Sequence, residues 1–387
     1  MINKLDSDFE VCHFVGLSGV GGVQRNFSEY MKLEIISGNE YKHTIYTLGR
    51  VDDQYQFSTN ILNILELRNL VSLIFDLISK SKIVHFYNNL TSLKVAIFLF
   101  FIPVKKLIVH ERGSAWNLSS KRGFILKFIV WKSDLVLANS MATKALIEKK
   151  FGISKNKIKV IHNGVNTSIR LKKKSLENEK TFFIGFIGRL DTPKGVHILI
   201  SAMHNLKYEN IKLIIAGDGP LKQDLANKAR NLKNIQFIGR VSDPYKFFNT
   251  ISLLVVPSIR EPLGNVCLEA GLCRVPVLAA NVDGLPEIIE NKISGELIDA
   301  TEEISINTVQ GAISLPEFVV NPVKGDLSAP KQINPFILAK RILKLSYQDD
   351  KLKYYSDELN KKVKNKFSID RYRRELHKMY REIDIKG

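Results

Sequence analysis

The sequence contains few cysteines, and they show no regular spacing. Cys12, Cys267 and Cys273 are the three cysteines of the chain, and they form neither a C-x-x-C pair nor a Cys/His pattern. An odd number of cysteines without such a pattern argues against a disulfide framework and against a structural zinc site. This usage is typical of a reduced, cytoplasmic protein.

Long apolar segments are also lacking. The longest uncharged apolar run, residues 95–104, contains Pro103 and falls far short of the ~20 residues that a membrane-spanning helix needs. Near the N-terminus, Asp6, Asp8 and Glu10 occupy the place of a signal peptide's apolar segment. We therefore expect a cytoplasmic protein, with peripheral attachment to the inner face of the cell membrane as a further hypothesis.

Acidic residues are scarce relative to basic ones. The chain has 57 Lys+Arg against 39 Asp+Glu, a formal net charge of +18 at pH 7. Such an excess suits an anionic membrane surface, a phosphate-bearing substrate or nucleic acid, although a compositional surplus of solvated lysines explains it equally well. We expect no nucleic-acid partner, because neither a helix-turn-helix signature nor an aromatic RNA-binding motif accompanies the charge.

Predicted strands and helices alternate along most of the chain. With 387 residues, 45% of them hydrophobic, the sequence is too long for one core and predicts two domains. The strands are expected at residues 11–15, 43–48, 83–87, 106–109, 134–138 and 158–161, and again at 181–187, 212–216, 235–238 and 253–256, with residues 61–79 largely helical. This alternation predicts an α/β fold with Rossmann-like, doubly wound domains.

The stretch that carries most chemical information is VVPSIREPLGNVCLEAGLCRVPVLAANVDGLPEIIE, residues 255–290. A strand leads into a Pro-Leu-Gly turn and then into a helix that opens near Gly264. The first N–H groups of such a helix, at Gly264, Asn265 and Val266, favour a phosphate. Glu269 in the second turn suits the vicinal hydroxyls of a ribose. From the two glutamates alone, an ordinary strand–helix unit remains the simpler interpretation.

Other loops at predicted strand ends carry glycines or charges. Arg189 and Lys194 lie in GRLDTPKG, beginning at Gly188, where two cations can neutralise a departing diphosphate without a metal; a solvated surface loop is the alternative. A glycine loop ending in Gly21 and Gly22 opens into an amphipathic helix, so its backbone could approach a diphosphate. His110 follows a strand, where a ligand edge is expected, although a lone histidine is more often structural.

The ordered string S-x-x-E-x7-E-A, P-V-L-A and G-L-P-E-I-I resembles the nucleotide-sugar signature of the retaining GT-B glycosyltransferases of family 4. G-R-L-x-x-x-K-G, the Gly-Gly-Val-Gln-Arg piece and N-G-V-N at residues 163–166 resemble the same family. Two departures concern sugar specificity. Residues 262–265 read Pro-Leu-Gly-Asn where the family has a Gly-Phe-Gly run, and residues 284–286 read Gly-Leu-Pro where it has Gly-Gly.

The resemblance implies a GT-B fold, in which two Rossmann-like domains face each other across a cleft. The acceptor-binding domain would comprise residues 1–168, with a C-terminal helix, residues 368–387, crossing back onto it. The donor-binding domain would comprise residues 169–367. The polar segment 170–180 is interpreted as the linker, and residues 301–334 as an insertion to which no chemistry is assigned.

The resemblance also implies an activity, a retaining hexosyl transfer (EC 2.4) from a UDP- or GDP-linked sugar to a glycan or lipid-linked acceptor. Bacterial surface polysaccharide or lipopolysaccharide synthesis is the expected setting, without cofactor or metal, since Asp6-Ser7-Asp8 is the nearest match to a D-x-D motif. The implied contacts to the diphosphate are Arg189, Lys194 and the amides near Gly21, Gly22, Gly264 and Asn265, and Gly188 and Val266 are further donor-binding residues. The base would lie at Arg240 and Val241, the ribose at Glu269 and the sugar at Glu261 and His110. A nucleotide-sugar epimerase or phosphorylase shares the fold, and a basic nucleic-acid- or membrane-binding protein is the alternative from another class.

Overall fold

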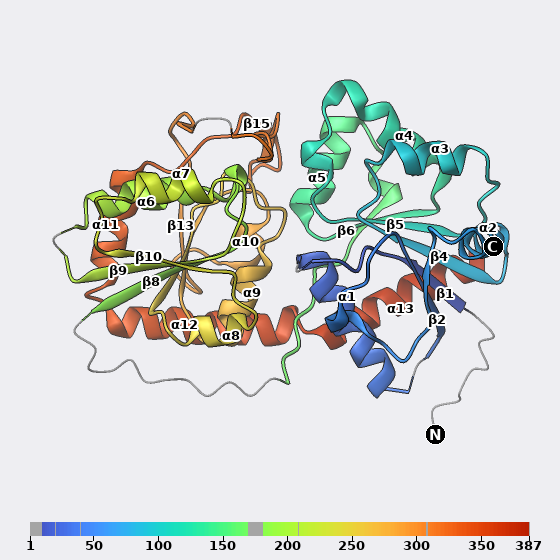
Figure 1. The fold of residues 1–387 in the computed structure, drawn as a ribbon, viewed down its shortest axis with the longest axis horizontal. Coiled ribbons are helices and arrows are strands. Elements are labelled where there is room, and N and C mark those ends of the chain that lie inside the picture. The colour runs from blue at the N-terminus through green and yellow to red at the C-terminus, as the bar shows by residue number, and fades with distance from the viewer. Residues whose placement is uncertain are drawn as a thin grey trace. The chain divides into compact units, whose positions relative to one another are not determined.

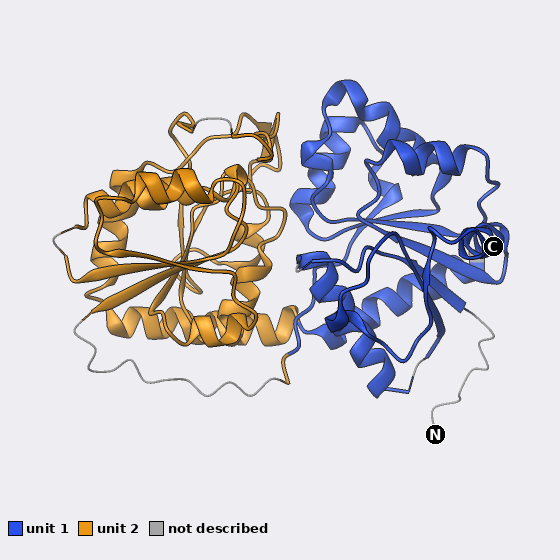
Figure 2. Ribbon diagram, in the orientation of Figure 1, with its two compact units in different colours: residues 1–166, 368–387 blue, residues 167–367 orange. Residues whose placement is uncertain are grey.

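A computed structural model describes residues 10–19, 21–38, 40–168, 181–207, 209–306 and 309–386. The chain divides into two compact units (Figure 2). Unit 1 comprises residues 1–166 together with 368–387, and unit 2 comprises residues 167–367. The expected linker, residues 170–180, lies outside the described residues. Each unit is built around a parallel sheet with helices on both faces, as expected for Rossmann-like domains (Figure 1).

Unit 1 contains a seven-stranded sheet in the order β3-β2-β1-β4-β5-β6-β7, with every pairing parallel. Its strands are β1 (Glu10–Phe14), β2 (Lys42–Thr47), β3 (Ile61–Asn63), β4 (Lys82–Tyr87), β5 (Leu107–Glu111), β6 (Leu135–Ala138) and β7 (Ile158–Val160). Its α-helices are α1 (Gly22–Ile36), α2 (Leu67–Ile78), α3 (Leu93–Phe100), α4 (Gly123–Lys132), α5 (Met141–Phe151) and α13 (Ile369–Lys386). The helical expectation for residues 61–79 was wrong at its start, because Ile61 pairs with Ile45 and extends the sheet.

The last helix of the chain, α13, is part of the core of unit 1. The buried aromatic rings of Tyr372 and Tyr380 belong to the same apolar cluster as residues of β1, β4 and α1. His85 on β4 lies 2.8 Å from the hydroxyl of Tyr380, and Arg373 donates to buried Glu34 on α1 at 2.8 Å. Because α13 contributes to this core, unit 1 is built from two segments that lie far apart in the sequence.

Unit 2 contains a six-stranded parallel sheet in the order β10-β9-β8-β11-β12-β13. Its strands are β8 (Phe182–Ile187), β9 (Ile211–Ala216), β10 (Ile235–Gly239), β11 (Leu253–Val256), β12 (Val277–Ala280) and β13 (Glu296–Ile298). Its α-helices are α6 (Val196–His204), α7 (Lys222–Lys228), α8 (Pro244–Phe248), α9 (Asn265–Leu272), α10 (Leu285–Ile288), α11 (Pro335–Leu345) and α12 (Asp349–Lys366).

The strand order of unit 2 reverses between β8 and β11. Chain connections leave the sheet in opposite directions at such a point, and the loops beyond the two carboxyl ends enclose a crevice where ligands collect. Within the predicted insertion, β14 (Val319–Val320) and β15 (Leu327–Ser328) form a short antiparallel hairpin. Among the described residues, no helix is both long and apolar enough to cross a membrane.

Candidate functional site

The loops that follow β8 and β11 touch each other at the reversal point of the unit 2 sheet. Gly195 has a left-handed backbone (φ 67°), and a Cβ atom there would lie 2.0 Å from the carbonyl oxygen of Pro257. The amide of Ile259 donates to the carbonyl of Pro193 at 2.9 Å. Only glycine can adopt this left-handed conformation and also come so close to another backbone carbonyl. Gly195, the final glycine of GRLDTPKG, therefore allows the two loops to lie in contact.

Lys194 and Glu261, one from each loop, form an ion pair at this junction. Their Nζ and Oε2 atoms are 2.6 Å apart, and Ser258 Oγ donates to the same oxygen at 3.2 Å. The Glu261 side chain is 8% exposed and that of Lys194 is 31% exposed. The structure therefore brings together two residues that the sequence predicted for the donor site, and the Lys194 side chain remains partly exposed.

Asp283 orients Glu261 through the backbone. Its Oδ2 accepts from the amide of Glu261 at 2.9 Å, and its Oδ1 accepts from the amide of Val320 at 2.7 Å. Burial raises the pKa of this carboxyl to about 7. Sequence reasoning missed Asp283, although it directly precedes the Gly284-Leu285-Pro286 piece of the motif.

Helix α9 begins beside the ion pair. Its N-cap, Gly264, has a positive φ of 100°, and a Cβ atom there would lie 2.7 Å from Leu285 and 3.5 Å from Glu261 Cγ. Asn265 and Val266 form the first turn of α9 and Glu269 lies buried in the second. The pKa of buried Cys267 is raised, first by burial and then by Glu261 and Glu269, while Lys194 lowers it. All three charged side chains therefore lie near the start of this helix.

Arg189 is held at the same edge of the sheet by Asp191. The Arg189 Nε donates to Asp191 Oδ2 at 2.6 Å, while the arginine side chain is largely exposed. Asp191 is buried, and its Oδ1 accepts from the amides of Thr192 and Ile313 at 2.9 and 2.8 Å. A buried carboxylate thus holds the Nε of Arg189, while 57% of the arginine side chain stays exposed.

Gly188, Arg240 and Val241 lie at neighbouring strand ends. A Cβ atom on Gly217, after β9, would lie 1.8 Å from the carbonyl oxygen of Gly188, after β8. The Gly217 amide also donates to Gly239, at the end of β10, at 2.7 Å. Arg240 is exposed, and its Nε lies 3.6 Å from Asp218 in the turn after β9. The residues predicted to bind the base therefore share an edge with Arg189.

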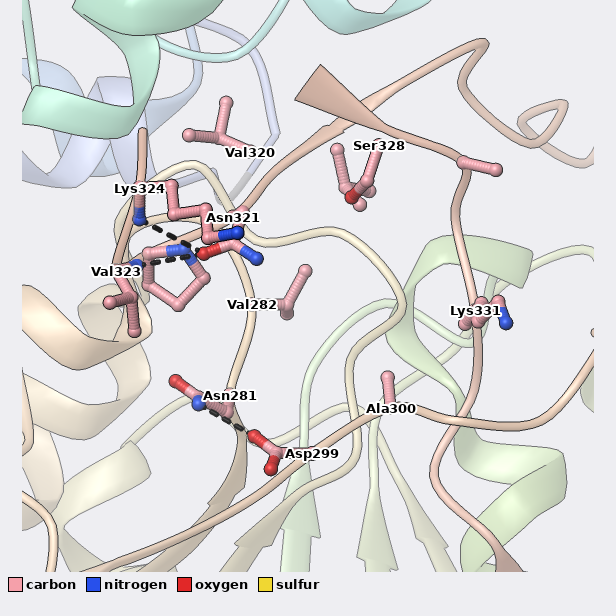
Figure 3. A pocket seen from close by; sticks show the side chains of 13 residues that line it. Asn281, Val282, Asp299, Ala300, Val320, Asn321, Val323, Lys324, Ser328 and Lys331 are labelled. Carbon is pink, nitrogen blue, oxygen red and sulfur yellow. Dashed lines mark hydrogen bonds between the residues drawn. The ribbon is translucent and has the colours of Figure 1, made fainter. Parts of the chain in front are cut away.

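The predicted insertion contacts the site. Ile313 donates to Asp191, and Val320 of β14 donates to Asp283, so the insertion is bonded to both buried aspartates that orient the site. An open hollow of about 460 Å³ is lined by residues of this hairpin and by residues that directly follow β12 and β13, among them Asn281 and Asp299 (Figure 3). Asn281 donates to Asp299 across its floor at 2.7 Å, and none of the predicted site residues lines it.

In unit 1, the predicted diphosphate glycines lie at the start of α1. Gly21 is the N-cap of this helix, with an extended backbone, and Gly22 is its first residue. The α1 N-terminus therefore presents backbone N–H groups at the carboxyl edge of the unit 1 sheet, where an anion is favoured.

His110 does not occupy an accessible position, which corrects the expectation that it lies over the donor sugar. Strand β5 continues through Glu111, so His110 lies within the sheet and points toward α13. Its ring stacks on His85, with centroids 5.5 Å apart, and is completely buried. Burial lowers the pKa of His110 well below its usual value, and neither ring nitrogen has a hydrogen-bond partner among the residues that the structure describes.

Arg112, two residues further on, is a charged residue that lies buried just after this strand. Its guanidinium group donates to the side-chain oxygens of Asn26 on α1 and Asn163 after β7. No carboxylate in the described part of the chain pairs with it, and burial lowers its pKa. Arg112 thus fastens the N-terminal part of α1 to the strand ends, a role that the sequence pattern did not reveal.

Unit 1 is expected to lose stability in acid because it buries neutral histidines. Burial lowers the pKa values of His13, His85 and His110 well below 6.5 in the folded protein, so the unfolded chain takes up their protons first. The free energy of unfolding is therefore highest above pH ~6.5, where these histidines are neutral in both states, and it decreases as the pH falls below that value. At pH 5.5 the loss amounts to about 1.4 kcal/mol per histidine.

Replacing His110 by phenylalanine tests both its burial and its lack of a sugar contact. H110F removes one of these protonation sites, so denaturant unfolding should show a loss between pH 7.5 and 5.5 that is smaller by about 1.4 kcal/mol. Turnover should stay within about threefold of wild type. A fall of 100-fold or more in a stably folded variant would restore His110 to the site.

Two models of known protein families match this chain. The family model described as Glycosyl transferases group 1 matches residues 168–316, and the model described as Glycosyltransferase Family 4 matches residues 42–169. Together they cover residues 42–316, which include the loops after β8 and β11 in unit 2 and strands β2 to β7 of unit 1. The chain belongs to the family 4, group 1 glycosyltransferases.

Named relatives of this glycosyltransferase include proteins of capsule and lipid-linked saccharide synthesis. The capsular polysaccharide biosynthesis glycosyltransferase CapM of Staphylococcus aureus is 28% identical over 262 residues, 63% of this chain and 60% of that protein. An N-acetylgalactosaminyltransferase of Campylobacter jejuni, which acts on N-acetylgalactosamine-N,N'-diacetylbacillosaminyl-diphospho-undecaprenol, is 29% identical over 205 residues, 51% of this chain and 55% of that protein. The chain thus matches a little over half the length of these relatives.

Among solved structures, HepE of Anabaena in complex with UDP and glucose has a TM-score of 0.73 and 18% identity to this glycosyltransferase. The match covers 96% of this chain and 99% of HepE. This likeness confirms the expected GT-B fold, with its two parallel-sheet, Rossmann-like domains.

Proposed function

We propose that this glycosyltransferase moves a sugar from a nucleoside-diphosphate sugar to a hydroxyl group of a glycan or lipid-linked acceptor, with retention of the anomeric configuration. The observation that carries the proposal is the Lys194–Glu261 pair, which is 2.6 Å long and lies beside the N-terminus of α9. Lys194, a cation that can bind phosphate, and Glu261, a carboxylate that can accept hydrogen bonds from sugar hydroxyls, thus lie at the same edge of the unit 2 sheet. Glu269 is buried in the second turn of α9.

The cations would act on the diphosphate. As the bond between the sugar C1 and the phosphate oxygen breaks, negative charge grows on the leaving group. Lys194, Arg189 and the first N–H groups of α9 all offer positive potential at this edge, and such fixed groups stabilise developing charge without reorganising. Donor binding would draw the Lys194 ammonium from Glu261 toward the phosphate, which leaves the carboxylate able to accept from sugar hydroxyls.

The remaining groups would position the donor and complete the proton transfer. Glu269 would accept from the ribose hydroxyls, and the base would lie near Arg240 and Val241. The acceptor oxygen forms the new bond to C1 while the old bond to phosphate breaks, and the acceptor proton passes to the departing phosphate. We assign His110 no role in this reaction, because its side chain is completely buried in unit 1.

The relatives support a setting for this reaction. The names of CapM and the Campylobacter enzyme point to synthesis of capsular or lipid-linked saccharides, and lipopolysaccharide is the third acceptor class we include. The ligand of HepE favours UDP over GDP as the donor nucleotide. We place the protein in the cytoplasm, at the inner face of the membrane, where a lipid-linked acceptor would be exposed.

A thermal-shift screen tests the donor assignment. UDP, GDP, ADP and their sugars are added in turn, and a ligand that binds the folded state raises the melting temperature in accordance with its concentration and affinity. We expect UDP or a UDP-sugar to give the largest shift. Equal and negligible shifts with every nucleotide would contradict the proposed donor site, and conversion of the donor without any acceptor would indicate an epimerase instead.

We further predict transfer without a divalent metal and with retention. Lys194, Arg189 and the α9 N-terminus supply the positive charge that a D-x-D motif obtains from a metal, whereas Asp6-Ser7-Asp8 lies outside the described residues. Product formation in excess EDTA should therefore equal that in buffer, and NMR of the first-formed product should show the anomeric configuration of the donor. Activity that vanishes in EDTA contradicts the first half, and an inverted anomer contradicts the second.

A further inference from the structure

Helix α4 of unit 1 is apolar on both of its sides. Ile125, Leu126, Ile129 and Val130 pack into the core, while Phe124, Phe128 and Trp131 recur at helical spacing on the opposite side. Phe124 and Trp131 are exposed, the latter by 71%. A surface helix ordinarily places polar residues on its outer side, so the outer face of α4 is suited to contact something other than water.

Helix α3 places a second apolar stripe beside the first. Leu93, Ile97 and Phe100 lie along its outer side, and Phe101 follows with 78% of its surface exposed. The two helices pack against each other and enclose an open hollow of about 350 Å³. Its lining is entirely apolar: Ala96, Ile97, Phe100, Phe101, Phe124, Ile125 and Phe128. We call this area, with Trp131, the α3–α4 surface.

The charges around the α3–α4 surface are almost all positive. Between residues 88 and 133 the sequence contains one acidic residue, Glu111, and the structure buries it under bonds from Gly113, Ser114 and Ala115. The exposed cations are Lys94, Lys105, Lys121, Arg122 and Lys127. Lys132 lies 5.5 Å from the centre of the Trp131 ring and donates to the carbonyl of Ile102 at 3.1 Å.

We propose that the α3–α4 surface docks unit 1 onto an anionic bilayer, with Phe100, Phe101, Phe124 and Trp131 entering the interface and the surrounding cations facing lipid phosphates. Exposed aromatic side chains among lysines combine the apolar and electrostatic attractions that hold proteins at such membranes. A second copy of the chain fits less well, because two such surfaces would bring their exposed lysine and arginine side chains against each other. The inference extends the proposed function, since a lipid-linked acceptor would lie at the same interface. Its test measures membrane binding and does not depend on glycosyl transfer.

The two tryptophans of the chain provide a direct measurement. Trp116 is 1% exposed in the core of unit 1, whereas Trp131 lies on the docking surface. Vesicles of 30% phosphatidylglycerol in phosphatidylcholine should shift the tryptophan emission of the full-length protein to the blue, and brominated lipids should quench it. Because Trp116 is buried, the change reports Trp131, and a W116F variant that retains it confirms the assignment.

Two groups of variants separate the apolar and basic contributions. F100S/F101S removes exposed rings and should reduce vesicle flotation at least tenfold. K121Q/R122Q/K127Q removes three cations near the surface, and at about 1 kcal/mol each the expected loss is about 100-fold. The matched control is K353Q/K364Q/K366Q, which removes equal charge from exposed positions of α12 in unit 2 and should change flotation less than threefold.

The outcomes distinguish membrane docking from its alternatives. Flotation that weakens with salt, disappears on pure phosphatidylcholine and falls in both surface variants supports the proposal. Equal loss in the α12 control would overturn it in favour of net charge alone. An absence of vesicle binding, together with a dimer that dissociates in F100S/F101S, would overturn it in favour of self-association. Donor-induced thermal shifts serve separately to check the proposed transferase, because none of these variants lies in unit 2's site.

Discussion

Replacing both Arg189 and Lys194 by alanine is expected to lower kcat by about 10³-fold or more. Removal of one fixed donor to a developing negative charge typically costs 10²–10³ in rate, and each factor of ten corresponds to about 1.4 kcal/mol. The two cations reach the ligand edge from one loop, and each is anchored by a carboxylate, Asp191 or Glu261. The α9 N-terminus would remain as the source of positive potential, so a residual rate should persist.

The anchoring also creates a structural cost that must be measured separately. K194A leaves Glu261 largely buried without its cation, and an unpaired buried group typically destabilises by about 1–3 kcal/mol. The unfolding free energy of each single variant and of the double variant should therefore be determined alongside kcat. R189A should also destabilise the fold, because it leaves the Asp191 side chain, 1% exposed, without its cation. The amides of Thr192 and Ile313 still donate to that carboxylate.

A matched control for the double variant is R274A/K361A. Both residues belong to unit 2 and pair with acids of α12, Asp357 and Glu358. This variant loses the same two charges and two ion pairs away from the ligand edge, and kcat should remain within about twofold of wild type. If R189A/K194A is folded and retains activity within tenfold, another group neutralises the diphosphate and our assignment is wrong.

The local sequence predicted those parts of the fold that depend on neighbouring residues. Leu253–Val256 is a short apolar run before Pro257, and it forms β11 with the expected bounds. The glycines of GRLDTPKG and of the Pro-Leu-Gly turn were recognised because backbone constraints at turns restrict residue choice. The pairing of Lys194 with Glu261 follows from the reversal of strand order, since the loops after β8 and β11 must then lie side by side.

Contacts between distant segments could not be predicted in this way. Val320 and Ile313 of the insertion bind Asp283 and Asp191, which lie 37 and 122 residues away in the chain. The insertion has no strong periodicity, and its bonds use backbone amides that carry no side-chain signature. His110 was misplaced for a related reason. Strand β5 continues one residue further than expected, to Glu111, so His110 lies inside the strand and its ring faces α13. The ends of strands and helices are the least reliable part of a prediction from sequence.

Replacing Glu269 by alanine is expected to weaken donor binding by about 2–3 kcal/mol, which corresponds to a 30- to 150-fold higher Kd. Glu269 is buried on the second turn of α9, and it acts electrostatically on both Cys267 and Cys273. A carboxylate in such a place can accept charge-assisted hydrogen bonds from both ribose hydroxyls, and alanine removes both.

Calorimetric titration with the nucleoside diphosphate isolates this contribution, because the ligand contains the ribose but not the transferred sugar. The corresponding 2′-deoxynucleotide should bind wild type more weakly and should bind E269A with little further loss, since the missing hydroxyl and the missing carboxylate concern the same bond. E358A, a Glu→Ala change on the outer side of α12 in the same unit, should leave both titrations unchanged. Unaltered nucleotide affinity in a folded E269A protein would show that Glu269 does not bind the ribose. A uniform loss for ribose and deoxyribose ligands would instead show that Glu269 supports α9 rather than the ligand.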